Sequence, residues 1–195
     1  MKIIDISQEL LSCRVYEGDP TPKMEKIMDI KNGEMYNLST FSMCAHNGTH
    51  VDAPLHFFED GNSVDKISLE HFVGGCFVAE YNGDVNSIDA RKILEKAKTL
   101  NAEKRILIKG SAIVTEEAAR VFADADILLL GNESQSVGPE DAPMQVHKIL
   151  LSKNIVLLEG VVLDNVREGR YILNCAPLNI KGAEGSPCRA ILIEE

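Results

Sequence analysis

The sequence contains no tryptophan, and aromatic residues fill only 5 % of its 195 positions. It also lacks a long apolar run at its start: MKIIDISQELLSCRVYEGD carries acidic residues early, unlike a signal peptide or a spanning helix. Basic residues are few, because 20 Lys and Arg stand against 30 Asp and Glu, a net charge of −10. Such a chain repels phosphate backbones and anionic lipid. We therefore expect a cytoplasmic protein with neither nucleic acid nor membrane partners.

Paired cysteines are missing as well. The five cysteines are odd in number, widely spaced and without any C-x-x-C pair: Cys13, Cys44, Cys76, Cys175 and Cys188. In a reducing compartment this pattern predicts free thiols, mostly buried as small apolar side chains. Only Cys44 lies close in sequence to a cluster of histidines.

The composition and length of the sequence indicate one globular domain. Apolar residues make up 45 % and charged residues 26 %, an ordinary soluble composition, and 195 residues suit a single domain spanning 1–195. Apolar runs at 105–110, 126–131 and 154–164 are typical of buried strands, and helical patterns separate them at 115–123 and 141–152. This alternation predicts an α/β fold with a parallel or mixed sheet.

Further elements are expected on either side of this region. Residues 87–100 read as a helix with Ser87 as its N-cap, and Thr115 is the expected cap of the helix that follows. The remaining expected strands are 2–7, 37–46, 76–81 and 189–193.

The segment from His46 to His56 carries the chemistry. It reads His-Asn-Gly-Thr-His-Val-Asp-Ala-Pro-Leu-His, with three of the chain's five histidines and one aspartate, all at even positions. In an extended chain even positions face one side, but residues four apart are about 13 Å apart. His46 and His50 can share an ion only if the chain bends, and Gly48 permits a bend.

Imidazole nitrogen with carboxylate oxygen suits zinc, manganese or iron(II) better than calcium or magnesium. A lone histidine in a loop is more often a hydrogen-bonded surface residue. The clustering of three beside Asp52 instead favours a metal site built from His46, His50 and Asp52.

The pattern His-x-Gly-Thr-His-x-Asp-x-Pro-x-His resembles the signature of the cyclase-like metal-dependent hydrolases, which include bacterial kynurenine formamidase and isatin hydrolase. Several other segments resemble blocks of that family: the opening DISQEL with Gly18-Asp19, the LLEG at 157–160, and the SPCRA at 186–190. The resemblance implies a compact α/β domain of the swivelling β/β/α type. It also implies a homo-oligomer, dimer or tetramer, that acts on a small molecule.

The resemblance further implies a role for each site residue. Asp52 would bridge from the first metal to a second, and His56 would donate and accept protons. The implied ligands of one or two ions, zinc being favoured over manganese and iron, are His46, His50, Asp52, His147 and Glu159. Without the family, His147 reads as a structural residue of a helix, whereas Glu159 at the end of a buried strand needs a partner for its charge.

The substrate is less sharply indicated. Tyr16 and Glu17 stand where kynurenine formamidases commonly have Trp-Pro, so Tyr16 is the expected substrate-stacking residue. We expect hydrolysis of an amide C–N bond, with N-formylkynurenine of tryptophan catabolism as the first candidate substrate. The alternatives are a cyclic amide such as isatin or another small acyl compound, and a metal-binding protein without turnover, which would not need His56.

Overall fold

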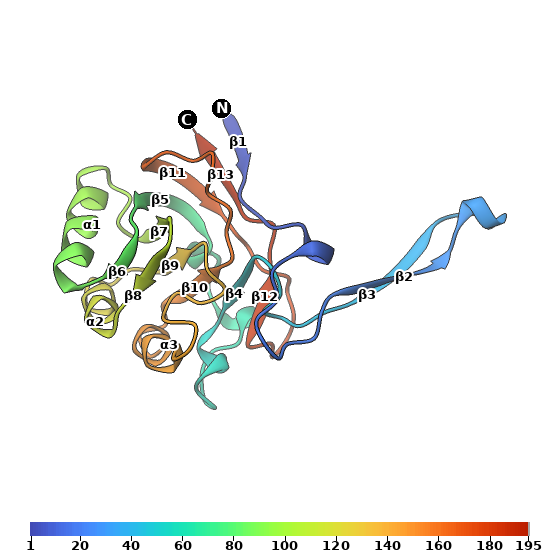
Figure 1. Ribbon diagram of the computed structural model, residues 1–195, viewed down its shortest axis with the longest axis horizontal. Coiled ribbons are helices and arrows are strands. Elements are labelled where there is room, and N and C mark those ends of the chain that lie inside the picture. Colours follow the sequence, from blue (N-terminus) through green and yellow to red (C-terminus); the bar gives the residue numbers. More distant parts are fainter. Residues whose placement is uncertain (195) are drawn as a thin grey trace.

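The computed structural model describes residues 1–194, which fold around one curled, mixed sheet (Figure 1). Its nine strands, in spatial order, are β1 (Lys2–Asp5), β13 (Ile191–Glu194), β11 (Gly169–Asn174), β5 (Val73–Glu80), β7 (Arg105–Lys109), β9 (Leu129–Asn132), β10 (Val156–Glu159), β4 (His50–Asp52) and β12 (Gly185–Pro187). The two ends of the chain pair with each other in β1 and β13. The α/β class predicted from the sequence is therefore confirmed.

The centre of the sheet is parallel. Strands β5, β7, β9 and β10 run in the same direction, each paired to the next. Helices α1 (Ser87–Thr99), α2 (Glu116–Asp124) and α3 (Met144–Leu151) connect them and cover one face (Figure 1). A small parallel pair, β6 (Gly83–Val85) with β8 (Ala112–Val114), lies beside them. The alternating strands and helices expected from residue 105 onward are found.

Each central strand contributes to two cores because neighbouring side chains point to opposite faces. Phe77, Ile106 and Leu157 pack under the helices, whereas the adjacent Val78 and Leu158 pack on the other face. That second face is covered by the outer strands and the loops between them. Burial on both faces explains why these strands read as continuous apolar runs.

One expected helix cap was wrong. Ser87 is the first residue of α1, and the N-cap is Asn86, whose side chain accepts hydrogen bonds from the backbone N–H groups of Ile88 and Asp89. Asparagine and serine are both good caps, so local preference alone does not choose between these neighbouring residues. The expected cap of α2 is confirmed, since the Thr115 side chain accepts from Ala118 N.

The segment before the motif differs most from expectation. The predicted strand 37–46 is shorter, β3 (Leu38–Ser42), and it pairs with β2 (Lys23–Met28) in a hairpin that projects from the body (Figure 1). Its alternation therefore does not reflect packing on a core. Short 3-10 turns complete the chain at Leu10–Ser12, Ile30–Asn32, Pro54–His56, Val64–Lys66 and Leu69–His71.

Two other expectations concern the whole chain. All five cysteines are free, as predicted. Only Cys76 and Cys175 are buried, whereas Cys13, Cys44 and Cys188 are partly exposed, so the expectation that most of them are buried was wrong. Among residues 1–194 we find no helix with the length and apolar character that crossing a membrane requires.

Candidate metal centre

The motif bends at its glycine. Gly48 has φ +65°, a left-handed conformation that side chains rarely adopt, and it lies between His46 and β4. Thr49 fastens this bend: its hydroxyl donates to the carbonyl of Gly160 at 2.7 Å and accepts from Gln8 N at 2.9 Å. The expected bend at Gly48 is therefore present.

The expectation of one extended face over the motif was only partly right. His50 and Asp52 alternate on β4, but His46 reaches the same place through the turn, and His56 ends a 3-10 turn that begins at Pro54. Because proline lacks an N–H and follows a strand end, it starts a helical turn here instead of extending the strand.

Sheet register brings the second half of the site to the first. Strand β10 is antiparallel to β4, and Glu159 lies directly opposite His50. Opposite residues of an antiparallel pair project from the same face. His147 lies on α3, the helix that leads into β10, and is only 4 % exposed. The structure thus brings together all five residues expected as ligands, from three separate segments.

The side-chain atoms meet in a symmetrical way. His50 Nε2 lies 3.5 Å from Asp52 Oδ1 and 3.5 Å from Glu159 Oε2. His147 Nε2 lies 3.6 Å from Asp52 Oδ2 and 3.2 Å from Glu159 Oε1. Each carboxylate therefore presents one oxygen to His50 and the other to His147.

These spacings fit a metal. Ligand atoms held at about 2.1 Å around a tetrahedral ion stand about 3.4 Å apart. Two sets of donors are compact enough to hold an ion, with ligand atoms within 4.8 Å of one another: His46, His50 and Asp52, and Asp52, His147 and Glu159. Asp52 belongs to both sets, which suits a carboxylate shared between two ions. His46 departs from the pattern, because its Nδ1 is 2.7 Å from Asp52 Oδ1, a hydrogen-bond distance.

Backbone carbonyls orient the histidines. His50 Nδ1 faces the carbonyl of Gly48 at 3.0 Å, and His147 Nδ1 faces that of Pro143 at 2.9 Å. If Nδ1 carries the proton in each ring, Nε2 is left with a lone pair directed at the carboxylates. Such outer hydrogen bonds commonly fix the tautomer of metal-binding histidines. The buried Nε2 of His46 makes no hydrogen bond with any residue in 1–194.

In the protein without metal, the buried histidines and carboxylates of the site stabilise one another's charged forms. Burial acts against charge on His46, but Asp52 raises the pKa of His46 to about 9. Burial is again outweighed at His147, whose pKa is raised to about 10 by Asp52 and Glu159. Burial alone would raise the pKa of Asp52, yet His147 and His46 hold the pKa of its carboxyl well below the usual value.

Metal uptake should therefore release protons. At about pH 7.5 His46 and His147 are charged in the metal-free protein, since their pKa values of about 9 and 10 lie above that pH. A ligand nitrogen must be neutral, so binding expels about two protons from these two histidines, and His50, whose pKa is also raised by Glu159 and Asp52 against the effect of burial, adds to the release. The number of protons released falls as pH rises past these pKa values. Calorimetry of zinc binding in buffers of different ionisation enthalpy measures the number of protons released. A value near zero at about pH 7.5 would contradict the ion pairs described above.

His56 lies beside this cluster but belongs to neither donor set. Its ring centroid is 4.2 Å from that of His46 and 6.2 Å from that of His147, and Phe57 packs edge-on at 4.7 Å. Burial lowers the pKa of His56, and the neighbouring His46 charge adds to this effect. At neutral pH the ring is therefore uncharged and can accept a proton.

A cavity of about 260 Å³ opens onto these side chains. It is lined by the five proposed ligands and by His56. Six further residues complete its wall, and of these only Tyr16 was expected from the sequence: Tyr16, Asp19, Phe57, Gln135, Ser136 and Pro143. Gln135 Oε1 and Ser136 Oγ are buried and have no hydrogen-bond partner within 1–194. No local pattern marks these two residues, because they enter the site through the loop that follows β9.

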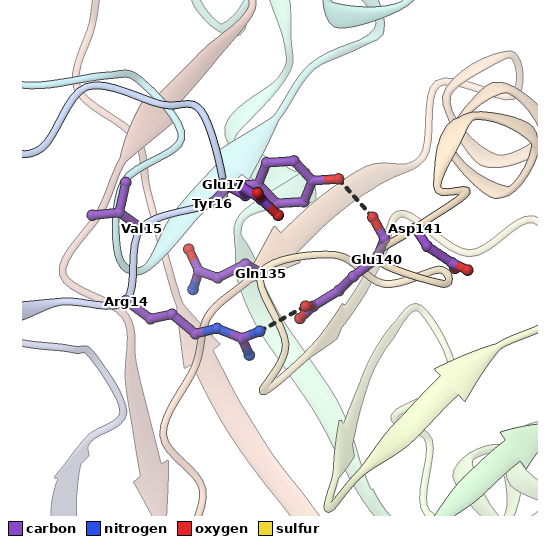
Figure 2. A pocket seen from close by; sticks show the side chains of 7 residues that line it. All are labelled: Arg14, Val15, Tyr16, Glu17, Gln135, Glu140 and Asp141. Carbon is purple, nitrogen blue, oxygen red and sulfur yellow. Dashed lines mark hydrogen bonds and ion pairs between the residues drawn. The ribbon is translucent and has the colours of Figure 1, made fainter.

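A second, larger cavity of about 560 Å³ adjoins the first, and Tyr16 and Gln135 line both. Figure 2 shows Tyr16 donating to the backbone carbonyl of Glu140, at 2.6 Å, while Arg14 forms an ion pair with the Glu140 carboxylate, also at 2.6 Å. Glu17 and Asp141 are the other charged residues on its wall. Tyr16, expected to contact substrate, thus stands between the donor cluster and a charged outer chamber.

Comparison with known proteins agrees with this geometry. The family described as “Putative cyclase” matches residues 4–139. A kynurenine formamidase of Salinibacter ruber is 34 % identical over 98 % of this chain and 97 % of its own. A solved structure described as a potential metal-dependent hydrolase with cyclase activity is 28 % identical, with a TM-score of 0.81 over 98 % of this chain and 96 % of that chain.

A third comparison concerns the fold alone. Isatin hydrolase A from Labrenzia aggregata, solved with benzyl benzoate, superimposes with a TM-score of 0.83 over 100 % of this chain and 94 % of that chain. Its sequence identity is 22 %.

Proposed function

Because this chain belongs to the cyclase family of metal-dependent hydrolases, we propose that it hydrolyses the formamide C–N bond of N-formylkynurenine, releasing formate and kynurenine. The observation that carries the proposal is the donor cluster itself. Five histidine and carboxylate side chains converge at one end of a cavity, and an uncharged histidine lies beside them. Kynurenine formamidase relatives that match along nearly their whole length supply the substrate.

The site residues have separate proposed roles as metal ligands and as a proton-transfer group. The proposed ligands are His46, His50, Asp52, His147 and Glu159. A divalent ion such as zinc supplies a lowered pKa for water, toward about 7, and polarises a carbonyl. His56 takes the proton that water loses as it attacks the formyl carbon. It then gives that proton to the aryl nitrogen as the C–N bond breaks.

The two cavities suit a substrate with two parts. The inner cavity accepts the formyl-aryl group next to His56, with Tyr16 and Phe57 as its aromatic walls. The outer chamber, with Arg14 and three carboxylates, accepts an amino acid tail that carries both charges. A compact cyclic amide such as isatin would leave the outer chamber unused.

The test is turnover by purified, metal-loaded protein. N-formylkynurenine, formanilide and isatin are offered separately, and formate or the ring-opened acid is measured. We expect the highest kcat/KM with N-formylkynurenine and a lower value with formanilide, which lacks the charged tail. Preference for isatin would replace the proposed substrate with a cyclic amide, and no turnover of any of the three would favour a metal-binding protein.

The ring of Tyr16 should matter more than its hydroxyl. Aromatic stacking contributes about 0.5–1.5 kcal/mol, so Tyr16→Ala should raise KM for N-formylkynurenine about threefold to tenfold with little change in kcat. Tyr16→Phe keeps the ring and loses only the bond to the Glu140 carbonyl, so it serves as the matched control. Steady-state kinetics of both variants measure the split, and equal effects would assign the role to the hydroxyl.

A further inference from the structure

A buried oxygen at the junction of the two cavities has no partner in the described chain. Gln135 is only 4 % exposed, and its side-chain oxygen, Oε1, makes no hydrogen bond with any residue in 1–194. Burying an acceptor without a donor is costly, so an unpaired buried oxygen in a folded protein calls for an explanation. Gln135 lines both the inner cavity and the outer chamber. This position indicates a donor on a molecule that occupies the cavities.

The surrounding chain fixes the orientation of the Gln135 amide. Its nitrogen, Nε2, faces the carbonyl oxygen of Gly48 at 3.4 Å. The same nitrogen fills part of the space that a side chain on Gly160 would take, and Gln8 Nε2 fills another part. Turning the amide over would set Oε1 against the Gly48 oxygen, and neither of these two acceptors has a proton to share. Oε1 is therefore held on the side away from this backbone.

The outer chamber has more negative than positive groups around Gln135. Arg14, the one cation among its lining residues, is already paired with the Glu140 carboxylate at 2.6 Å. Glu17 and Asp141 add two further carboxylates to the wall. Figure 2 shows the Gln135 side chain lying among these residues. A chamber of this charge attracts a cation, and an amide oxygen accepts a hydrogen bond from an ammonium group but not from a carboxylate.

We propose that Gln135 Oε1 accepts a hydrogen bond from the α-ammonium group of the substrate, so that Gln135 selects aryl formamides that carry an α-amino acid tail. The inference rests on the proposed hydrolysis of N-formylkynurenine and names the residue that recognises its tail. In that substrate a carbonyl and a methylene group separate the ring from the carbon that bears the ammonium group. With the formyl group beside His56, the ammonium group therefore lies toward the outer chamber, which Gln135 also lines.

This contact is remote from the bond that breaks. It is made equally in the bound substrate and in the transition state, so its loss should raise KM and change kcat little. A hydrogen bond to a charged group that is lost in a buried site weakens binding about tenfold to a hundredfold. A substrate without the ammonium group should lose the same factor, because it leaves Oε1 buried and unpaired.

Kinetics with a matched pair of substrates test the assignment. The pair is N-formylkynurenine and its des-amino analogue, which keeps the ring, the ketone, the carboxylate and the formamide and lacks only the α-amino group. Gln135→Met removes Oε1 with little change in side-chain length. We expect the wild type to prefer N-formylkynurenine in kcat/KM. We expect Gln135→Met to reduce this preference about tenfold to a hundredfold, through KM.

Gln8→Met is the matched control. Gln8 Nε2 donates to the carbonyl of Gly160 at 2.8 Å and shares the space beside Gly160 with Gln135, but Gln8 lines neither cavity. Both substitutions remove an amide that supports the same backbone, and we expect Gln8→Met to keep the wild-type preference. An unchanged preference in Gln135→Met overturns the inference, even if overall activity falls. A preference reduced as far in Gln8→Met also overturns it, because the role is then structural.

Product binding separates this inference from the proposed function. Calorimetry on the zinc-loaded protein compares kynurenine with des-amino kynurenine and needs no turnover. If the wild type hydrolyses neither formamide, the proposed function fails. The inference then stands only if kynurenine binds about tenfold to a hundredfold more tightly than its analogue and Gln135→Met removes that difference. Equal binding of the two by the wild type overturns the inference. Hydrolysis of both formamides at equal kcat/KM overturns it and leaves the proposed reaction intact.

Discussion

Replacing His46 and His50 together with alanine is expected to give a folded protein that retains no metal and shows no measurable hydrolysis. The two side chains supply two of the three donors in one set, and His50 also faces the Glu159 carboxylate of the other. Loss of a catalytic metal centre removes most of the rate enhancement that such an enzyme can give. Elemental analysis and an activity assay on the purified variant measure both effects.

The fold should survive this double substitution because the buried carboxylates of the site can bind protons and so lose negative charge. Without His46 and His50, Asp52 and Glu159 keep only His147 as a buried cationic partner, so burial and their mutual repulsion raise the carboxyl pKa values until the pair binds a proton. His71→Ala is the matched control, since His71 is the one histidine of the five outside the cluster. A double variant that keeps stoichiometric metal would refute the assignment of these ligands.

His56→Ala is expected to keep its metal and lose about 10²–10⁴-fold in kcat, the usual contribution of general acid–base catalysis. The ring of His56 stands next to the donors without joining either set, so its removal leaves all five proposed ligands in place. Its lowered pKa keeps it in the basic form at neutral pH. Elemental analysis and single-turnover kinetics separate metal loss from loss of the chemical step.

The pH dependence of activity tests whether His56 acts in its unprotonated form. Because the pKa of His56 lies below the ordinary histidine value, activity of the wild type should hold down to slightly acidic pH and fall only where His56 becomes protonated. His56→Ala should lose that acidic limb. If metal and activity instead disappear together, His56 is a ligand and another group moves the proton.

Much of the architecture followed from local pattern. The strands β7, β9 and β10 are short apolar runs because they are buried on both faces, and the helices between them have clear caps or amphipathic spacing. The motif could be recognised because three histidines and an aspartate fall within eleven residues, around a glycine that permits a left-handed turn. In each case the residues that carry the signal are neighbours in sequence.

Other features could not be found in this way. Strand β12 has three residues and lies at one edge of the sheet, so its pattern is too brief to stand out. Strand β11 has six residues, but only Tyr171 and Leu173 among them are buried, so it lacks the continuous apolar run of the central strands. Strand β3 of the projecting hairpin looked like an ordinary strand because alternation is the same whether a strand packs on its own core or projects from it. Gln135 and Ser136 were missed since only the loop after β9 brings them to the cavity.

The sequence by itself determined the α/β class, the chemical character of the donors and the turn at Gly48, because these depend on composition, periodicity and the conformational freedom of single residues. Only the tertiary structure decided that Glu159 lies opposite His50 and that His147 faces both carboxylates. Pairing of β4 with β10 joins residues more than a hundred positions apart, and no local preference specifies such a register. It is set by which faces of both strands can be buried together, a property of the whole sheet.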